Sequence, residues 1–460
     1  MKKRDDIEEI DDEIIDDEII DDDEIVDDVE EVEEERPRRS APRAQKAQNK
    51  KKGLSKGAKI GIISGSAAVG VIAIALVALF VILPALGINI FSKKAATYDG
   101  PSITKDIYCD FTTSYGLYFY GDDHEPYNTD MTDVDMVRAS ESLSTKYFDP
   151  SKPTIIWFHG WEPTGSVGDR YLMAGADTRK VMKTYDCSYA HELKEKGYNV
   201  GTFQFQGVEG EDTNYAQSLA VIYKYAVENF NETGYSLSFL FASEIIKVFG
   251  ESYAKDITFA GHSCGGFVST ATNYMLQAFY HAGKISNKNL IAKRMIVQDP
   301  YVNTLSDGLS TNAKLMGTDE LIGDRRKGTV VQDMMIKLHK FDNVAIDVYL
   351  GMSIASSEFI DPNKSHFNEV LEHVVVIDMT GLKKWQGSIG NIHVLTRDWC
   401  WRSILENKLK DQDGNLAPSG ACTNDEILSM VGNLYQQQNA KWDFATESLQ
   451  KVSDTSGFKF

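Results

Sequence analysis

The chain has 460 residues with a formal net charge of −20 at pH 7, and 42% of its residues are hydrophobic. The acidic balance argues against nucleic-acid binding, because phosphate backbones are held by clustered Lys and Arg. Five cysteines are too few for a disulfide-rich scaffold, and no Cys/His spacing predicts a zinc site. We therefore expect neither a bound metal nor a cofactor.

The chain begins with two segments of opposite charge. Residues 1–35 carry 21 Asp and Glu against three Lys and Arg, whereas residues 36–59 carry ten Lys and Arg and no acid. Repulsion between like charges favours a solvated chain over a stable helix. We predict a disordered acidic tail over 1–35, whose partner the sequence does not identify, and a basic juxtamembrane linker over 36–59.

Residues 60–91 contain no charged side chain. About 20 apolar residues suffice to span a bilayer, so this segment predicts one transmembrane helix that acts as a signal-anchor. The ten basic residues lie before the segment, and the positive-inside rule then places the N-terminus in the cytoplasm. We expect a single-pass protein of the cell membrane whose remaining residues are extracytoplasmic.

From about residue 105 to residue 460, apolar strands alternate with helical stretches. Strands are expected at 116–120, 154–159, 199–205, 255–260, 294–299, 343–349 and 373–378, and helices at 188–196, 236–249 and 266–276. This alternation predicts an α/β domain with a mostly parallel sheet covered by helices on both faces. Active sites of such sheets lie at the carboxyl ends of the strands.

The sequence Gly-His-Ser-Cys-Gly at 261–265 lies between an expected strand and an expected helix. A serine on such a turn, with a glycine two residues away on each side, is typical of the nucleophile elbow of serine hydrolases. The pattern predicts Ser263 as the nucleophile. The backbone N–H of Cys264 is then expected in the oxyanion hole, and its thiol is expected to be free.

The strand at 154–159 ends in His159-Gly160-Trp161. Acyl transfer requires backbone N–H donors aimed at the developing oxyanion. Gly160 lets the chain turn there, so the N–H of Trp161 is the expected partner of the Cys264 N–H. His159 is interpreted as a buried packing residue and not as the catalytic base.

Three segments, 142–161, 261–266 and 296–300, resemble the pancreatic-lipase-like branch of the α/β-hydrolase family. The resemblance covers about residues 115–400 and implies an α/β-hydrolase fold with lipase or esterase activity. In that branch the strand after the elbow ends in Asp-Pro, and its aspartate orients the catalytic histidine. Asp299 matches that position. The chain departs from the family at 204–206, where an Asp-Trp is usual, and it lacks the cysteine pair that commonly brackets the lid.

The catalytic histidine should follow the acid in the chain order Ser, Asp, His. His393 lies after the last expected strand, in a predicted loop where the family's histidine belongs, before a helix-like stretch at 399–408. His366, in a predicted polar loop, is the alternative base. Asp347 and Asp378 are the alternative acids if the acid lies on a later strand.

Three further features are less specific. Residues 301–342 are long for a strand-to-strand connection, which suggests a lid or substrate-binding insertion. The cluster Asp130, Asp133 and Asp135 could suggest calcium, but it lacks the glycine and distal glutamate of an EF-hand, so a solvated loop is expected. An oxidising exterior would permit disulfides Cys400–Cys422 or Cys109–Cys187, although the sequence does not determine the pairing.

Together these features predict a membrane-anchored serine hydrolase that cleaves carboxylic esters through an acyl-serine. Because a short tether holds the domain near the bilayer, the expected substrates are lipid acyl esters. Two other classes remain open. One is an inactive α/β-hydrolase fold that serves as a binding module, and the other is an acyltransferase or peptidase that uses the same serine.

Overall fold

In the computed structural model, residues 92–460 form one compact unit. All residues whose structure is described belong to this unit. They are 97–105, 115–121, 135–139, 143–160, 189–205, 215–230, 233–300, 314–315, 317–320, 322, 327–351, 364–379, 389–437 and 449–452. The predicted tail, linker and transmembrane segment (1–35, 36–59 and 60–91) lie outside the described residues.

The described strands form one ten-stranded sheet of order β10-β9-β8-β7-β6-β5-β3-β4-β1-β2. They are β1 (Gly116–Tyr120), β2 (Met136–Arg138), β3 (Thr154–Phe158), β4 (Asn199–Gln204), β5 (Ile257–His262), β6 (Arg294–Gln298), β7 (Ala345–Leu350), β8 (Val375–Asp378), β9 (Leu434–Gln437) and β10 (Leu449–Val452).

The strands from β3 to β9 run parallel to one another, whereas β1, β2 and β10 are antiparallel to their neighbours. The prediction of a mostly parallel α/β sheet is therefore confirmed, and each of the seven expected strands is present. β2, β9 and β10 were not expected from the sequence. The arrangement is consistent with an α/β-hydrolase fold, and the strand-turn-helix corner after β5 lies in the middle of the sheet.

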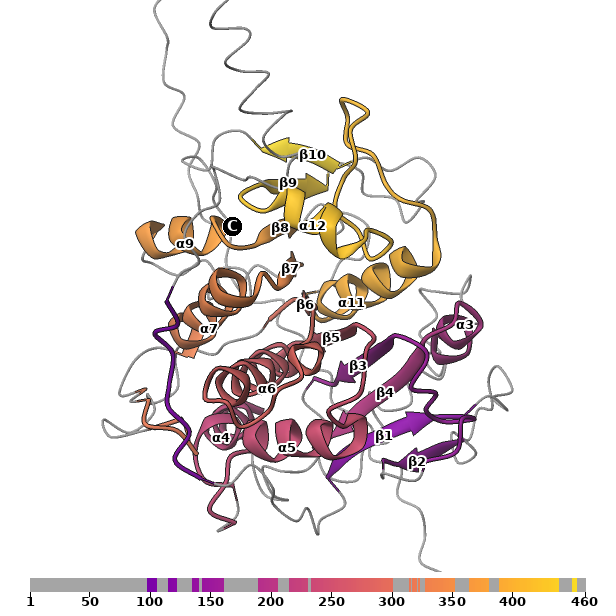
Figure 1. The fold of residues 1–460 in the computed structure, drawn as a ribbon. Coiled ribbons are helices and arrows are strands. Elements are labelled where there is room, and N and C mark those ends of the chain that lie inside the picture. The colour runs from indigo at the N-terminus through magenta and orange to yellow at the C-terminus, as the bar shows by residue number, and fades with distance from the viewer. Residues whose placement is uncertain are drawn as a thin grey trace, which may run out of the picture. The chain divides into compact units, whose positions relative to one another are not determined.

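Helices cover both faces of this sheet (Figure 1). They are α3 (Tyr189–Glu195), α4 (Tyr215–Val227), α5 (Leu237–Phe249), α6 (Cys264–His281), α7 (Lys327–Asp342), α9 (Lys364–Leu371), α11 (Ile389–Leu405) and α12 (Asn424–Met430), with the short 3-10 helix η4 (Lys288–Leu290). Of these, α4, α5, α6, α7 and α9 pack on one face, and α3, α11 and α12 on the other. Each face therefore has its own core.

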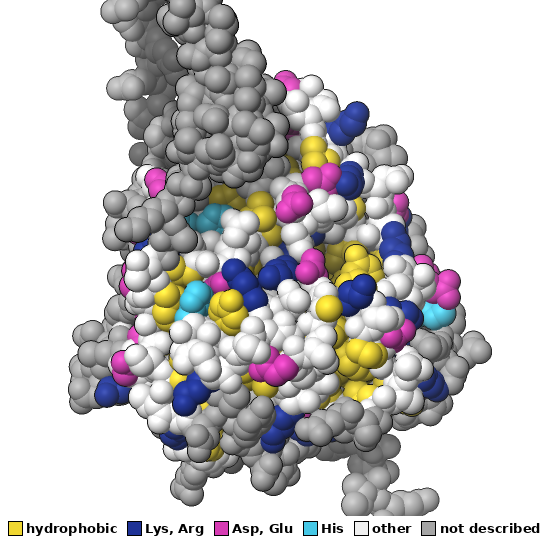
Figure 2. Space-filling model, viewed as in Figure 1, with side chains coloured by type: hydrophobic (Ala, Val, Ile, Leu, Met, Phe, Trp, Pro, Cys, Tyr) yellow, Lys and Arg dark blue, Asp and Glu magenta, His cyan; other side chains and the backbone are white. Residues whose placement is uncertain are grey.

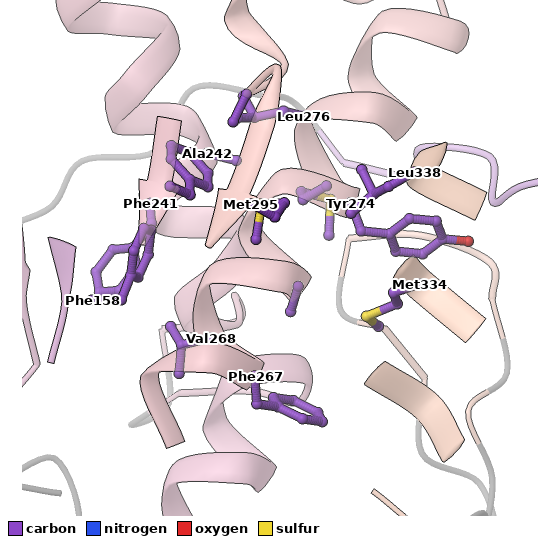
Figure 3. Packing of buried hydrophobic residues seen from close by; sticks show 14 of the residues in the cluster. Phe158, Phe241, Ala242, Phe267, Val268, Tyr274, Leu276, Met295, Met334 and Leu338 are labelled. Carbon is purple, nitrogen blue, oxygen red and sulfur yellow. The ribbon is translucent and has the colours of Figure 1, made fainter. Parts of the chain in front are cut away.

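The sheet supplies both cores by alternation, because successive side chains of a strand point to opposite faces. In β3, Ile156 and Phe158 join the cluster beneath α5 and α6, whereas Ile155 and Trp157 join the cluster beneath α11. Figure 3 shows Phe158 next to Phe241 of α5 in the first cluster. A central strand that is buried on both faces explains why its sequence is an unbroken apolar run.

Residues 97–104 also pack on this unit, ahead of the predicted boundary at residue 105. Tyr98 stacks on His281 with ring centroids 4.1 Å apart, Asp99 pairs with Lys340, and Ile103 forms a bridge with Thr318. The segment is thereby held beside the ends of α6 and α7.

The predicted lid insertion, residues 301–342, ends in an ordinary helix. α7 occupies its last 16 residues and packs against α6, and it connects to β7 as the crossover between parallel strands requires. Residues 301–313 lie outside the described residues. A lid stays a prediction only for the part of the insertion before α7.

Acidic and basic side chains are interspersed over the face drawn in Figure 2. Within the described ranges, no helix combines the length and the apolar character that crossing a bilayer requires. The predicted anchor at 60–91 is not among the residues to which this finding applies.

Candidate active site

The turn between β5 and α6 holds Ser263 in a strained backbone conformation, with φ 55° and ψ −128°. The geometry requires glycine on either side: a Cβ at Gly261 would lie 2.4 Å from the carbonyl oxygen of Gly265, and a Cβ at Gly265 would lie 2.3 Å from that of His159. The Ser263 N–H donates to the carbonyl of Gln298 on β6 at 2.9 Å. These contacts hold the serine at the carboxyl end of β5.

Asp299 directly follows β6 and is fully buried. Its backbone also has a positive φ, 41°. The Asp299 N–H donates to the carbonyl of Tyr349 at 2.6 Å, and its Oδ1 accepts from the N–H of Gly351 at 2.8 Å. The end of β7 thus holds both the backbone and one carboxylate oxygen of this aspartate, a role for Gly351 that the sequence did not reveal.

The other carboxylate oxygen of Asp299 contacts His393. The distance from His393 Nδ1 to Asp299 Oδ2 is 2.7 Å, and 16% of the histidine side chain is exposed. Because a carboxylate only accepts, Nδ1 carries the hydrogen, and in a neutral ring Nε2 is then the nitrogen that can accept a proton. The structure therefore brings together two of the three predicted triad residues, which are 94 positions apart in sequence.

The predicted loop around His393 is instead part of a helix. α11 begins at Ile389, four residues before the histidine. Gly390 and Asn391 are poor helix formers and favoured a loop in the sequence. Burial of Trp399 and Trp401 further along α11, against the sheet, outweighs that local preference.

The alternative acids have other partners. Arg294 donates to Asp347 from Nε at 3.0 Å and from Nη2 at 2.7 Å. The Tyr349 hydroxyl donates to the same carboxylate. Asp378 accepts from Gln436 Nε2 at 2.9 Å. The alternative base, His366, lies in α9 and not in the predicted polar loop, and its side chain is outside the description.

Only one of the two expected oxyanion donors lies among the described residues. Cys264 is the first residue of α6 and is fully buried, so its N–H belongs to the first turn of the helix that follows the serine. Trp161 lies outside the described residues. His159 binds backbone on both sides, since its Nε2 accepts from the Phe205 N–H at 3.1 Å and its Nδ1 contacts the Gly160 carbonyl at 2.7 Å. This agrees with a packing residue.

The described cysteines, Cys264, Cys400 and Cys422, are buried, and none of the three forms a disulfide. This agrees with the expectation for Cys264, whereas the suggested Cys400–Cys422 disulfide is wrong. Cys422 Sγ instead contacts the carbonyl of Ala417 at 3.3 Å, and burial raises the pKa of the Cys400 thiol to about 12. Cys109 and Cys187, the other suggested pair, lie outside the described residues.

No cluster of His, Cys, Asp and Glu in the described part of the chain has the composition of a metal site. In the suggested calcium cluster only Asp135 is described. It pairs with Lys146 at 2.9 Å and accepts from the Tyr147 hydroxyl at 2.8 Å. These two partners lower its pKa, although partial burial opposes them. Asp130 and Asp133 lie outside the described residues.

A cavity of about 620 Å³ opens at the amino ends of β3, β5 and β6, lined by Pro153, Asp256, Lys293 and Arg294 among others. Ser263, Asp299 and His393 lie at or beyond the carboxyl ends of the same strands. Because reactive groups in parallel α/β sheets gather at the carboxyl ends, we do not assign the cavity to the candidate active site.

No protein-family model and no curated protein matches the sequence. Among solved structures, dipeptidyl peptidase 4 of Porphyromonas gingivalis is 15% identical over 55% of this chain and 31% of that one, with a TM-score of 0.27. The acylaminoacyl peptidase of Pyrococcus horikoshii is 13% identical over 54% and 36%, with a TM-score of 0.27. Esterase B of Lactobacillus rhamnosis is 13% identical over 54% and 63%, with a TM-score of 0.20.

This chain thus matches about a third of the length of the two peptidases. Identities and TM-scores this low carry no argument about activity, and they do not distinguish the pancreatic-lipase-like branch from other α/β hydrolases.

Proposed function

We propose that this chain is a serine hydrolase in which Ser263 is the nucleophile, His393 the general base and Asp299 the residue that orients the base. The observation that carries the proposal is the 2.7 Å contact between His393 Nδ1 and Asp299 Oδ2. It lies beside the strained serine, since the side chain of the preceding residue, His262, contacts the carbonyl of His393 at 3.1 Å.

In the first half-reaction, Ser263 Oγ attacks the carbonyl carbon of an ester while His393 Nε2 takes the hydroxyl proton. The carbonyl π electrons move to oxygen, where the Cys264 N–H donates a hydrogen bond, with the Trp161 N–H as the second proposed donor. The intermediate then collapses, the carbon–oxygen bond to the alcohol breaks, and His393 returns the proton to the departing alcohol. An acyl-serine remains.

In the second half-reaction, water attacks the acyl-serine and loses a proton to His393 Nε2. The second tetrahedral intermediate expels the serine oxygen, which regains the proton, and a carboxylic acid is released. Throughout, the Asp299 carboxylate holds the Nδ1–H tautomer and stabilises the transient imidazolium. The three residues act as one unit. Ser263 attacks only when His393 takes its proton, and His393 can do so only in the tautomer that Asp299 holds.

For the substrate we propose carboxylic esters in or near a membrane, such as lipid acyl esters. The uncharged segment at 60–91, preceded by ten basic residues, supports a single-pass anchor with an extracytoplasmic domain. A tethered domain meets membrane lipids at a high effective concentration. The part of the insertion before α7 is the proposed lid.

The test uses the full-length protein in detergent micelles and a fluorophosphonate probe, which reacts with activated serines. We expect labelling of the wild-type protein and of Ser286→Ala, a control serine that binds Glu251 away from the site, but not of Ser263→Ala. A protein that stays unlabelled would be an inactive binding module, and the proposal would be wrong.

A panel of esters of increasing chain length then tests the substrate class. We expect faster turnover of aggregated lipid than of short soluble esters, and loss of much of the rate on bilayers when residues 1–94 are removed. Acyl transfer to an added alcohol as the main product would instead indicate a transferase, and cleavage of peptide bonds in preference to esters would indicate a peptidase.

A further inference from the structure

The residue before the candidate nucleophile, His262, contacts the helix that carries the candidate base. It is the last residue of β5 and only 4% exposed. Its Nε2 lies 3.1 Å from the carbonyl oxygen of His393. A carbonyl only accepts, so His262 Nε2 carries the hydrogen and donates it. The bond therefore joins the chain neighbour of Ser263 to the backbone of His393 itself.

Aromatic contacts hold the imidazole of His262 in place for this bond. One side of its ring faces Trp157 of β3, with centroids 6.3 Å apart and ring planes 15° apart. His393 is the next aromatic neighbour, with centroids 4.3 Å apart. Trp157 also makes an edge contact with Trp401 of α11. The first turns and the middle of α11 are thus connected to β3 and β5 through one row of rings.

This connection matters because α11 begins only four residues before His393. Asp299 holds the ring of His393 through Nδ1, whereas His262 contacts the backbone from which the ring projects. An error of 1 Å in a catalytic group costs about 100-fold in rate. A hydrogen bond from β5, the strand that precedes the serine, limits the displacement of the His393 backbone relative to Ser263.

We propose that His262 is a positioning residue that sets the separation of Ser263 and His393 by donating from Nε2 to the His393 carbonyl. The inference rests on the proposed serine-hydrolase function. In this role His262 exchanges no proton with substrate. Its contribution depends on a donor at the position of Nε2, and its removal lowers kcat while KM stays nearly unchanged, because substrate binding does not use it.

The experiment compares His262→Gln with His262→Met in the full-length protein. The two side chains have nearly the same length and shape, but only Gln has an N–H donor near the position of Nε2. We expect kcat for a short ester to fall about tenfold in the Met variant, because the base is misplaced. A tenfold loss corresponds to about 1.4 kcal/mol of activation free energy. The Gln variant should recover to within about threefold of wild type, and KM should change less than twofold in both.

His339→Phe is the matched control. His339 Nδ1 makes the same kind of bond, to the carbonyl of Val344 at 3.1 Å, but at the amino end of β7. It should lower thermal stability as much as the His262 variants and leave kcat unchanged. His262→Phe, which keeps the aromatic row and lacks the donor, replaces the Met variant if that protein does not fold and should show the same loss of kcat.

Equal kcat values for the Gln and Met variants would overturn the role of the hydrogen bond. So would a loss of kcat in His339→Phe as large as in His262→Met. Both results leave the proposed function intact, provided that the wild type hydrolyses esters and Ser263→Ala does not. A wild-type protein inactive on every ester and unreactive with the probe overturns both proposals.

Discussion

Two buried aspartates on neighbouring strands of this sheet have opposite kinds of partner. Asp299, at the carboxyl end of β6, accepts a hydrogen bond from His393 Nδ1. Asp347, in the middle of β7, contacts Arg294, which stays charged at any relevant pH. Both carboxylates are fully buried, so burial alone does not separate a candidate catalytic residue from a structural one.

The difference lies in how completely each pair is satisfied. Arg294 donates to both oxygens of Asp347 and to the carbonyls of Ser419, Gly420 and Cys422. Burial would lower the pKa of Arg294, yet the Asp347 carboxylate raises it above its ordinary value. The result is a permanent ion pair that anchors the loop before α12. In the other pair the histidine keeps a basic Nε2 for a reacting group.

Backbone strain distinguishes the two aspartates as well. Asp299 has a positive φ, whereas Asp347 sits in regular parallel pairing with Ile296 and Val375. Strained backbone persists only where surrounding contacts enforce it, and such residues concentrate at functional sites. The carboxyl ends of β5 and β6 hold the strained residues Ser263 and Asp299 and the contact of Asp299 with His393, whereas the cavity and Arg294, the first residue of β6, lie at the amino ends.

The largest expected effect is on activity at the carboxyl ends. Ser263→Ala, His393→Ala and Asp299→Asn should each lower kcat for ester hydrolysis by about 10³- to 10⁶-fold, because each removes a member of one proton-transfer unit. Double variants should be hardly slower than single ones. Steady-state kinetics on one short ester checks this, and near-full activity of His393→Ala would move the base to His366.

The next effect is on stability at the permanent pair. Asp347→Asn leaves a buried guanidinium without its counter-charge, which should lower the free energy of unfolding by about 3–5 kcal/mol. The double variant Arg294→Met/Asp347→Leu should recover much of that loss. Denaturant titration measures it, and the fraction that stays folded should keep its kcat. If Asp347→Asn instead kept its stability and lost its activity, Asp347 would be the catalytic acid.

A third prediction concerns the elbow at the carboxyl end of β5. A Cβ at Gly265 would lie 2.3 Å from the carbonyl oxygens of Phe158 and His159 at the end of β3, whereas a Cβ at Gly266 has its nearest contact, a Val297 methyl, at 3.1 Å. Gly265→Ala should therefore cost about 1–3 kcal/mol of stability and most of the activity. Gly266→Ala should cost less of both. Equal thermal shifts for the two variants would contradict the close approach of this turn to β3.

The smallest expected effect is at the start of α12, where Thr423 and Glu426 form a capping box. Hydrogen bonds from Lys408 and from the Thr423 backbone lower the pKa of Glu426 to about 2. A lowered pKa means that this carboxylate stabilises the fold above about pH 4.5, its usual range, and that the gain disappears as the pH falls toward 2. Glu426→Gln should therefore weaken the fold at pH 7 more than at pH 3.

Thr423→Ala removes the side-chain cap itself and should cost about 1 kcal/mol at every pH. Thermal unfolding of both variants across that pH range separates the two contributions. Activity at neutral pH should be unaffected by either variant, because α12 covers the amino ends and not the candidate site. A loss of activity without a loss of stability would contradict that division.

The sequence predicted the centre of the sheet better than its edges. β3 and β6 are buried on both faces, so their apolar runs are unambiguous. β9, whose sequence is Leu-Tyr-Gln-Gln, was missed because nothing in it alternates or is strongly apolar. It is a strand because β8 and β10 lie on either side of it, and that is a tertiary cause.

The residues of the candidate site also differ in how far the sequence predicted them. Ser263 was predicted from local turn chemistry and Asp299 from a resemblance to a family. His393 was placed after the last expected strand, but its helix depends on long-range packing of two tryptophans. Gly351 and His262 act through a backbone N–H and a side-chain contact across the sheet. No sequence pattern indicates such contacts, because the partners are far apart along the chain.

The positive φ of Ser263 means that stability and activity compete for one position. In the described part of the chain, only Ser263, Asp299 and Asn343 are non-glycine residues with positive φ. Such a conformation costs about 1–3 kcal/mol in a residue with a side chain, and glycine would relieve it. Selection for stability alone would therefore replace the serine by glycine. In a chain that no longer needed catalysis, the single substitution Ser263→Gly would give a more stable and permanently inactive protein.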